Sequence, residues 1–544
     1  MAGLAEPCRQ AVEGMEEELG RGAGKCEPWS RWVVPGVFVV FMAAMAVLSK
    51  GFLEADEVNH FLRAKAIWRE WRSILDIWGR FGANGLFGLA APFGITAARL
   101  VAVGVTTLTG IATGIIAKHF LVQNDKSGSW IGRHGVAFAW LMLFAQPCFA
   151  LYSFMVMTEM LLACTWAWAV AILVLGRGKK GGGIVLAGVV LGLGGWMRPE
   201  GWIAVAVWPM FAMLWLRRGI SYRQKQTETD KQWGWRLVLS VLMTGLPTLL
   251  WYLLGVYGLH DWFWVKHGWP WAVQSQYGKT GLTFLVAAGS AMAGWLWISV
   301  AIGIFAIATI KPRDCSPWAW LHDEQLARHE GLLLLVTPFL GLFLMHGLLG
   351  SFGLFGSMSL PRYFISVAPM GAVLGVMGFI RMERACKGGL VLVIRGGAIV
   401  LAIGTLVVLH CGHLLPMPED ADYKRLAVVS AAIRNRLPAD DITSRLITIH
   451  PYVLYQLDLS GTRGTGGPGD GWKGIAEAPA GTLLITDSLW YKEGLPKPEV
   501  LEAWGYRVDE QVATEVDAVT LVAEPWSFES GIDKRVRLWE KGKE

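Results

Sequence analysis

Charged residues are scarce in this chain of 544 residues, because Asp, Glu, Lys and Arg together make up only 17% of it. Hydrophobic residues reach 53%, with 29 Trp, whereas soluble globular chains hold about 45 to 50% apolar residues even when Gly is counted. The few charges cluster between long apolar runs, as expected of helices that satisfy their own backbone in lipid. The composition therefore excludes an ordinary soluble protein and indicates a polytopic membrane protein.

Several other signals are missing. The first 31 residues are long and partly acidic and do not resemble a cleaved signal peptide, so we expect a cytoplasmic tail there. The net charge of +6 comes with no basic patch interleaved with aromatics, which argues against a nucleic-acid partner. The Gly-rich stretch 461–474 lacks a phosphate-binding signature and is typical of a surface loop. We find no internal repeat of fixed short period.

Cysteine is also sparse, at seven residues. With the N-terminus placed in the cytoplasm, Cys8, Cys26, Cys315 and Cys386 fall on the reducing side. Cys148 and Cys164 lie within apolar runs, and Cys411 approaches the outer face. This distribution predicts no structural disulfide.

Apolar runs long enough to span a bilayer, at roughly 20 residues each, recur about eleven times. The pair on either side of Arg198 and Pro199 is short and indicates either one broken helix or two tilted ones. The runs cover about 32–49, 98–118, 134–152, 157–176, 183–197, 201–216, 237–256, 282–310, 331–350, 363–380 and 390–415.

The orientation follows from the short loops, where Lys and Arg gather on the cytoplasmic side. The loops on one side carry most of the cations, and the opposite loops hold only Arg198, Lys266, Lys279 and Arg362. This asymmetry predicts a cytoplasmic N-terminus and, with an odd number of spans, an external C-terminal region. We expect a tail at 1–31, a transmembrane domain at 32–415 with its first external loop at 50–97, and an external domain at 416–544.

The region after Leu415 changes character. MPEDADYKRLAVVSAAIRNRLPADD predicts a helix, RLITIH a buried strand, and TLLITD, AVTLVAE and KRVRLWE further strands, with PEVLEAWGYRV as an intervening helix. Helices that alternate with short apolar strands are typical of a small α/β domain.

The first external loop begins with GFLEADEVNHFLRAKAIWREW, residues 51–71. It places Glu54, Asp56 and Glu57 at a membrane edge, although an ionised group costs roughly 3 kcal/mol at the bilayer centre. Apolar residues then recur at helical spacing, as in a helix that lies in the headgroup plane. We interpret the loop as an acidic catalytic corner beside an interfacial helix. The alternative is a helix N-terminal cap formed by Asp56 and Glu57.

Carboxylates, a few cations and many Trp are predicted to meet at the outer leaflet. Carboxylates and indoles bind hydroxylated rings, while Arg and Lys neutralise phosphate, so the set suits a lipid phosphate and a sugar. Purely structural roles remain open for these residues, namely a packing histidine, a helix cap, snorkelling arginines and an aromatic belt at 262–271. The candidate residues are Glu54, Asp56, Glu57, His60, Thr158, Glu159, Arg198, Glu200, Lys266, His267, Arg362 and Tyr363.

The layout resembles that of the GT-C membrane glycosyltransferases. An acidic pair, Asp56 and Glu57, follows one span, and an interfacial helix, many spans and an external C-terminal domain come after it. The chain is similar in particular to bacterial relatives of the dolichyl-phosphate-mannose protein mannosyltransferases and of the aminoarabinose lipid A transferase. MVMTEMLL, MRPEG and LPRYF match recurrent short patterns of such enzymes. Glu54 and Ala55 stand where the eukaryotic mannosyltransferases often have His and Pro.

The resemblance implies inverting transfer of a sugar, mannose or another hexose or pentose, from a polyprenyl-phosphate donor. The acceptor would be a protein, lipid or glycan on the external face, and membrane lipids would be further partners. It suggests Asp56 as general base and Glu57 as a residue that orients the acceptor or holds a divalent ion. Arg362, with Arg198 or Lys266, would neutralise the leaving phosphate. His60 lies four residues after Asp56, but the metal, Mg or Mn if any, stays unknown. A bacterial inner membrane is expected rather than the endoplasmic reticulum.

Two other classes stay open. About eleven spans with polar residues also suit a transporter or a flippase of lipid-linked sugars, although such proteins commonly place charges at the midplane in repeated halves. An assembly protein whose external C-terminal domain binds a partner is the third reading.

Overall fold

The computed structural model describes residues 30–53, 55–124, 129–176, 182–223, 230–268, 294, 296–308, 331–352, 361–412, 414–419, 421–448, 450–459, 473–487, 496–519 and 536–542. The chain forms two compact units. The first consists of Met1–Ala46, Leu75–Ala83 and Arg99–Cys411, and the second of Val47–Ile74, Asn84–Ala98 and Gly412–Glu544.

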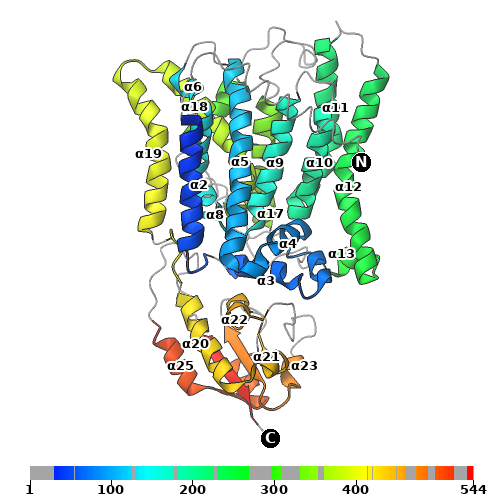
Figure 1. The fold of residues 1–544 in the computed structure, drawn as a ribbon, viewed down its shortest axis with the longest axis vertical. Helices are drawn as coiled ribbons and strands as arrows, with labels where there is room; N and C mark the ends of the chain where they lie inside the picture. The colour runs from blue at the N-terminus through cyan, green and yellow to red at the C-terminus, as the bar shows by residue number, and fades with distance from the viewer. Residues whose placement is uncertain are drawn as a thin grey trace. The chain divides into compact units, whose positions relative to one another are not determined.

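The first unit is a bundle of apolar helices, and Figure 1 shows its long helices running in roughly parallel directions. Within the described residues, seven helical segments are long and apolar enough to cross a membrane, and two apolar helices are shorter. The seven are α2 (Ser30–Leu48), α5 (Ile95–Asn124), α9 (Thr158–Leu175), α12 (Asp230–Leu259), η4 (Leu332–Val336) with α17 (Thr337–Phe352), η5 (Pro361–Val367) with α18 (Ala368–Ala385), and α19 (Gly389–Cys411). The shorter two are α7 (Gly135–Phe144) and α10 (Gly182–Met197).

Further helices complete this unit: α6 (Trp130–Arg133), α8 (Pro147–Tyr152), α11 (Pro199–Arg223), α13 (Trp264–His267) and α15 (Leu296–Ala308). The predicted polytopic α-helical fold is confirmed, and most described helices lie within the apolar runs of the sequence. The run 134–152, expected as one span, is instead divided into α7 and α8 at Ala145 and Gln146. The described cysteines Cys148, Cys164, Cys386 and Cys411 are free thiols, while Cys8, Cys26 and Cys315 lie outside the described residues.

Glycine allows the closest helix contacts in the bundle. A Cβ atom at Gly378 of α18 would collide with the carbonyl oxygen of Ser299 in α15, and one at Gly303 of α15 would meet the carbonyl of Leu374 in α18. Small residues bring helix backbones together in this way where no water is present to drive association. The α15 and α18 helices therefore form one tightly packed pair.

The chain breaks between α10 and α11 at Arg198, which is not helical. Pro199 follows as the first residue of α11, where its missing N–H has no intrahelical partner to lose. The two short apolar runs are therefore two separate helices. Because α9 and α10 follow each other along the chain and pack together, the start of α9 and the end of α10 lie at the same end of the bundle.

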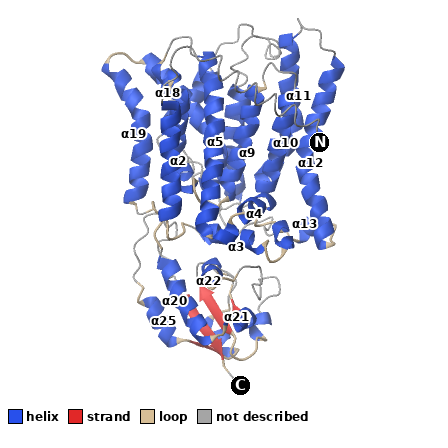
Figure 2. Ribbon diagram, viewed as in Figure 1, coloured by secondary structure: helices blue, strands red, loops and turns tan. Residues whose placement is uncertain are grey.

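The second unit holds a four-stranded mixed sheet, drawn red in Figure 2, in the order β1-β2-β4-β3. Its strands are β1 (Leu446–Ile447), β2 (Leu483–Asp487), β3 (Tyr506–Val508) and β4 (Val536–Lys541), of which β1 and β2 are parallel and the other pairs antiparallel. Its helices in the C-terminal region are α20 (Ala421–Arg436), α21 (Ala439–Arg445), α22 (Pro451–Gln456), α23 (Lys473–Ala476), α24 (Pro498–Ala503) and α25 (Glu510–Asp517). The sheet confirms the predicted small α/β region.

Two details of this unit differ from the sequence interpretation or fall outside it. The stretch PEVLEAWGYRV is helical only to Ala503, because Gly505 turns the chain with φ 83° and Tyr506 starts β3. Residues 520–524 of the predicted strand AVTLVAE, and 461–472 of the Gly-rich stretch, lie outside the described residues.

The loop at 50–97, predicted to be external, contributes helices to both units. The predicted interfacial helix is α3 (Ala55–Ala66), with Asp56 and Glu57 in its first turn. It packs against α22 inside the second unit, where Phe52 and Phe61 contact the ring of Tyr455 at centroid distances of 5.3 and 5.9 Å. The loop also forms η1 (Trp71–Leu75), α4 (Phe81–Gly88) and η2 (Ala91–Phe93).

Candidate functional site

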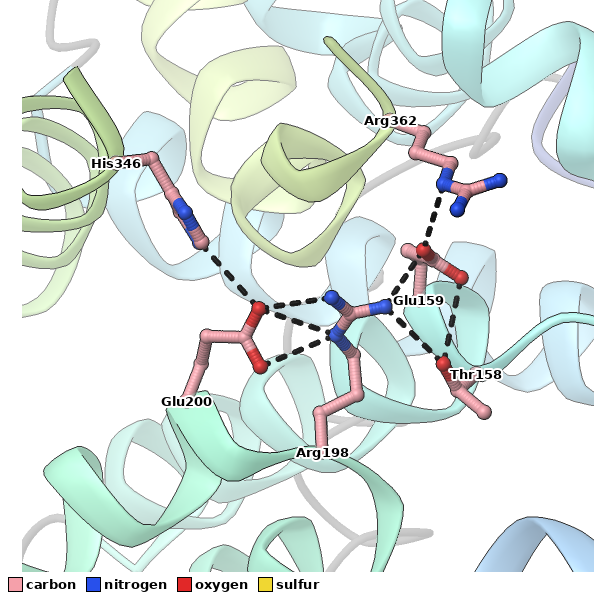
Figure 3. Close-up of polar contacts among 6 residues, drawn as sticks. All are labelled: Thr158, Glu159, Arg198, Glu200, His346 and Arg362. Atoms are coloured by element: carbon pink, nitrogen blue, oxygen red, sulfur yellow. Dashed lines mark hydrogen bonds and ion pairs between the residues drawn. The ribbon is translucent and has the colours of Figure 1, made fainter. Parts of the chain in front are cut away.

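Six polar side chains of the first unit meet in a buried network (Figure 3). The start of α9 and the break between α10 and α11 supply four of them, and α17 and η5 supply one each. We call this set the arginine network. Its members are Thr158, Glu159, Arg198, Glu200, His346 and Arg362.

Arg198 lies at the centre of the network. Its Nη1 is 2.6 Å from Glu159 Oε1 and donates to Thr158 Oγ1 at 3.1 Å. Its Nε and Nη2 donate to Glu200 at 2.9 to 3.2 Å, which is a forked contact with one carboxylate. Guanidinium and carboxylate groups match in this planar arrangement, so the fork fixes both side chains. Arg198 thus binds two carboxylates at once.

Arg362 reaches the same network from η5. Its Nε is 3.4 Å from Glu159 Oε1, the oxygen that Arg198 also contacts. Figure 3 marks this contact between Arg362 Nε and the Glu159 carboxylate. Tyr363, the next residue, lies beneath both cations, with its ring centroid 5.0 Å from the Arg198 guanidinium and 5.9 Å from that of Arg362. Cation–π contacts of this kind help to hold a cation in an apolar setting.

His346 in α17 closes the other side of the network. Its Nε2 is 3.4 Å from Glu200 Oε1, and its ring lies 5.0 Å from the ring of Tyr363. The side chain is 4% exposed. Its Nδ1 has no hydrogen-bond partner among the described residues, and Nε2 makes only the long contact with Glu200. An imidazole buried in this way costs free energy, so its presence beside Glu200 suggests a role in the site.

All six side chains of the network are buried, and Glu159 is only 1% exposed. Two arginines face two glutamates, so the formal charges balance before His346 is counted. A buried ion is tolerated when its charge and its hydrogen-bonding groups are both satisfied, as they are for Arg198. The network is therefore a fixed charged surface inside an apolar bundle.

Arg80 adds a further cation in the electrostatic range of the network. It belongs to the 75–83 segment of the first unit and has φ 68°, a left-handed conformation that is costly for a residue with a Cβ. Its pKa is lowered to about 10, mainly by burial and then by the charge of Arg198, against the opposing effect of Glu200, Asp76 and Glu159. A strained residue kept beside a like charge is a candidate for anion binding.

No protein-family model and no curated protein sequence matches the chain. Crystal structures of ArnT from Cupriavidus metallidurans match it over 94% of this chain and 98% of that one. The TM-score is 0.57 for ArnT bound to undecaprenyl phosphate and 0.58 for the apo state, at 13% and 12% identity. An oligosaccharyltransferase from Archaeoglobus fulgidus, in the apo form, matches with a TM-score of 0.48 at 11% identity.

The chain has the GT-C membrane fold. The likeness covers the transmembrane helices and the C-terminal region together, since almost the whole length of both chains is matched.

Within this GT-C fold, five residues singled out in the sequence come together. They lie far apart along the chain, yet Glu159, Arg198, Glu200, Arg362 and Tyr363 form one contact network. Thr158, the possible helix cap, instead accepts a hydrogen bond from Arg198.

Lys266 and His267 are not part of that network in the described residues. Both lie on α13, a short helix after α12, and both are exposed. His267 Nδ1 is 2.7 Å from Asp261 Oδ2, and this hydrogen bond lowers the pKa of Asp261. The pair stabilises the local loop, which accounts for His267 without a substrate.

The acidic corner belongs to the second unit of the GT-C fold. Asp56 is half-buried in the first turn of α3, Glu57 is fully buried and His60 is 6% exposed. Glu54 lies outside the described residues. Of the three described side chains, Asp56 has the most surface open to a substrate.

No group of three or more His, Cys, Asp or Glu residues with the arrangement of a metal site occurs within the described residues. The carboxylates of the arginine network are occupied by guanidinium groups instead.

Two members of this region escaped the sequence analysis. His346 is a single histidine in an apolar run, and Arg80 stands among the basic residues of the 50–97 loop. A polar residue within a predicted span is a functional signal by itself, and this signal would have identified His346. Nothing local distinguishes Arg80 from Arg63, Arg69 or Arg72.

Proposed function

We propose that the protein is an integral membrane glycosyltransferase that moves a sugar from a polyprenyl-phosphate donor to an acceptor at the extracytoplasmic face, with inversion. The GT-C fold shared with ArnT over nearly the whole chain carries this proposal. The acceptor is a protein, lipid or glycan, the sugar is mannose or another hexose or pentose, and the membrane is a bacterial inner membrane with the N-terminus in the cytoplasm.

The donor class is supported by the neighbour. ArnT was crystallised with undecaprenyl phosphate, and it has the same fold. A donor whose lipid lies in the bilayer presents its phosphate at the membrane edge. The arginine network lies where α9 begins and α10 ends, at one end of the bundle, which suits such a group.

We assign phosphate binding to Arg362 and Arg80 rather than to Arg198. Arg198 engages all three of its nitrogens with Thr158, Glu159 and Glu200, so it holds the network in place. Arg362 contacts the network through Nε, at 3.4 Å from Glu159 Oε1, which is longer than the contacts of Arg198 with Glu159 and Glu200. Preorganised cations aimed at a charge that develops during reaction stabilise the transition state most.

Asp56 is the proposed general base. Its carboxylate removes the proton from the acceptor hydroxyl as that oxygen attacks the anomeric carbon. The bond from the anomeric carbon to the phosphate oxygen breaks, and the lipid phosphate leaves with the bonding electron pair. The phosphate monoester is stable as an anion, so it needs cations rather than an acid. Arg362 and Arg80 supply them.

The decisive experiment incubates the purified protein with a panel of polyprenyl-phosphate sugars and measures released lipid phosphate. Asp56→Asn should lower turnover by about 10² to 10⁴-fold, as expected for loss of a general base. The exposed Asp440→Asn is the matched control and should leave turnover unchanged. Full activity of a folded Asp56→Asn protein would contradict the assignment of Asp56 as general base. If no donor in the panel released lipid phosphate, the proposed glycosyltransferase function would be wrong.

The same assay tests whether turnover depends on a divalent metal ion. Treatment with EDTA followed by Mg or Mn tests whether Glu57 holds a divalent ion as the sequence suggested. The mechanism above requires no ion, so turnover should survive EDTA. Loss of turnover that Mg or Mn restores would revise the mechanism.

A transporter or flippase of lipid-linked sugars is the second candidate. The break at Arg198 favours it, because broken helices with charged ends line many transport sites. Ion-gradient-dependent uptake by proteoliposomes, without release of lipid phosphate, would place this function first.

A further inference from the structure

A groove of about 490 Å³ opens in the second unit. It lies among α3, the 94–95 turn, α20 and the end of α22, and is therefore formed by the interfacial helix and the C-terminal region of one unit. Its volume falls in the range of about 300 to 1,000 Å³ found for small-molecule sites. The side chains used below are Phe61, Lys65, Tyr423, Arg434, Tyr455 and Gln456.

Aromatic rings form one part of its lining. Phe61 and Tyr455 meet edge to face with centroids 5.9 Å apart, and Tyr423 lies on the neighbouring helix. None of the three is a mobile surface side chain, since Phe61 is 3% exposed and both tyrosines are half-buried. Rigid rings that carry a polar tip bind the mixed apolar and hydroxylated faces of a sugar well.

The polar part of the lining is held in one geometry. Ser430 Oγ donates to Gln456 Oε1 at 2.9 Å, and Gln456 Nε2 donates to the carbonyl of Tyr423 at 3.0 Å. Arg434 donates to the backbone carbonyl of Gln456. Groups locked in advance lose little freedom when a ligand binds. The groove is therefore preorganised.

Its charges favour an anion. The lining holds two cations, Lys65 and Arg434, and one carboxylate, Asp458, which pairs with Lys65 at 2.5 Å. The Lys65 side chain is 28% exposed and that of Asp458 69%, and exposed pairs contribute little to stability. An anionic ligand can therefore pair with Lys65 beside or in place of Asp458 with little loss of free energy. Arg434 offers a planar fork suited to carboxylate or phosphate.

We propose that this groove binds the acidic saccharide portion of the acceptor, a sugar ring that carries a phosphate or a carboxylate. The role of this ligand as acceptor rests on the proposed transferase function. The binding of an acidic saccharide rests on the lining of the groove alone. Aromatic rings contact the ring face, Gln456 and Ser430 meet hydroxyl groups, and Arg434 with Lys65 meets the acidic group.

The test uses the full chain in nanodiscs and ligand-detected NMR with four probes: glucose 6-phosphate, glucuronate, glucose and inorganic phosphate. The two acidic sugars should bind at least about fivefold more tightly than glucose or phosphate alone. The comparison of phosphate with carboxylate identifies which acidic group the groove prefers, and either result supports the proposal. Equal binding of inorganic phosphate and glucose 6-phosphate would overturn it.

Variants locate the binding. Arg434→Ala should weaken both acidic sugars about tenfold and leave glucose unchanged, whereas Tyr455→Ala should weaken all three sugars. Arg507→Ala, an exposed arginine on β3 outside the groove, is the matched control. Lys65→Ala serves as a second test of the cations if Arg434→Ala fails to fold. Unaltered binding by a folded Arg434→Ala or Lys65→Ala protein would overturn the site.

The outcomes separate this inference from the function. Thermal stabilisation by undecaprenyl phosphate shows whether each variant keeps its fold and its donor site. If donors release lipid phosphate but no acidic sugar binds, the groove inference fails and the function stands. If acidic sugars bind but no donor reacts, the transferase function fails, and with it the role of the groove as an acceptor site.

Discussion

At the scale of single residues, Arg198 connects two buried carboxylates that would otherwise repel each other. Glu159 and Glu200 are 1% and 8% exposed, and each lies within 3 Å of a different part of the guanidinium. A charge buried without its partner costs far more than the pair itself contributes. The network should therefore respond more strongly to the loss of one member than to the loss of an opposite pair.

A double-mutant cycle tests this coupling. Arg198→Gln should destabilise the protein by about 3 to 5 kcal/mol, because it leaves Glu200 without an arginine and Glu159 with only the 3.4 Å contact to Arg362. Addition of Glu200→Gln should recover about 1 to 3 kcal/mol of that loss. Unfolding of the purified protein in detergent measures each variant. Strictly additive effects would show that the fork between Arg198 and Glu200 contributes no coupling.

Arg80 gives a prediction of pH dependence. Its surroundings lower the pKa from 12.5 to about 10, mainly through burial and then through Arg198. A lysine, whose usual pKa is about 10.4, should titrate near pH ~8 in the same place. The cation of Arg80→Lys is then present below that pH and lost above it, while Arg80 stays charged in the wild type.

Turnover of Arg80→Lys should consequently fall between pH 7 and pH 9 relative to wild type, with a loss of at least about tenfold at the upper end. The exposed Arg507→Lys is the control and should follow the wild-type profile. Parallel profiles for Arg80→Lys and wild type would remove Arg80 from the phosphate site.

Short motifs predicted much of this residue-level site. Charged residues at membrane edges attract attention because lipid penalises them, and this signal selected Glu159, Arg198, Glu200 and Arg362. This signal identifies single residues, however, and carries no information on which distant residues they contact. It could not state that Glu159 is shared by two arginines from separate segments, or that Arg198 uses its nitrogens within the network, because both facts depend on packing between distant parts of the chain.

At the scale of helices and strands, hydropathy predicted the spans well, since each buries apolar surface along one continuous segment. Boundaries were less certain, and the α10–α11 break was left open until the structure placed Arg198 outside both helices. The strands of the second unit are short, so they contain too few residues for the alternating apolar pattern of a strand to be recognised. Tyr506–Val508 was assigned to a helix because its apolar spacing fits either structure, and its pairing with β4 decides for a strand.

The close pair of α15 and α18 gives an element-scale prediction. Gly378→Ala places a methyl group against the backbone carbonyl of Ser299, which no rotamer change can relieve. The helices must separate, at an expected cost of about 1 to 3 kcal/mol. Gly404→Ala on α19 meets nothing within 4 Å and should be neutral or slightly stabilising. Thermal unfolding in detergent compares the two. Equal stability of both variants would contradict close packing at Gly378.

At the scale of the whole molecule, the sequence predicted two kinds of structure, a helical bundle and a small α/β region, and both are present. It divided them at residue 415. Contacts instead group segments 47–74 and 84–98 with the C-terminal region, because α3 packs on α22 and Phe52 and Phe61 contact Tyr455. Contacts between residues so distant in sequence leave no local signal in composition.

Membrane topology gives the last prediction, and it rests on one helix. Only α19 separates the loop at Lys387 from the C-terminal region, and it is long and apolar enough to span. Lys387 and the exposed Ser444 must then lie on opposite sides, whatever the absolute orientation. The excess of Lys and Arg near Lys387 predicts that this loop is cytoplasmic.

In a cysteine-free background, Ser444→Cys should react with a membrane-impermeant maleimide in intact spheroplasts, and Lys387→Cys only after the membrane is opened. Labelling of both sites from the same side would mean that α19 does not cross the membrane. Labelling of Lys387→Cys alone from outside would reverse the orientation and place the second unit, with its acidic corner, in the cytoplasm. The proposed chemistry needs the first result, because it assigns Asp56 and the sugar donor to the extracytoplasmic face.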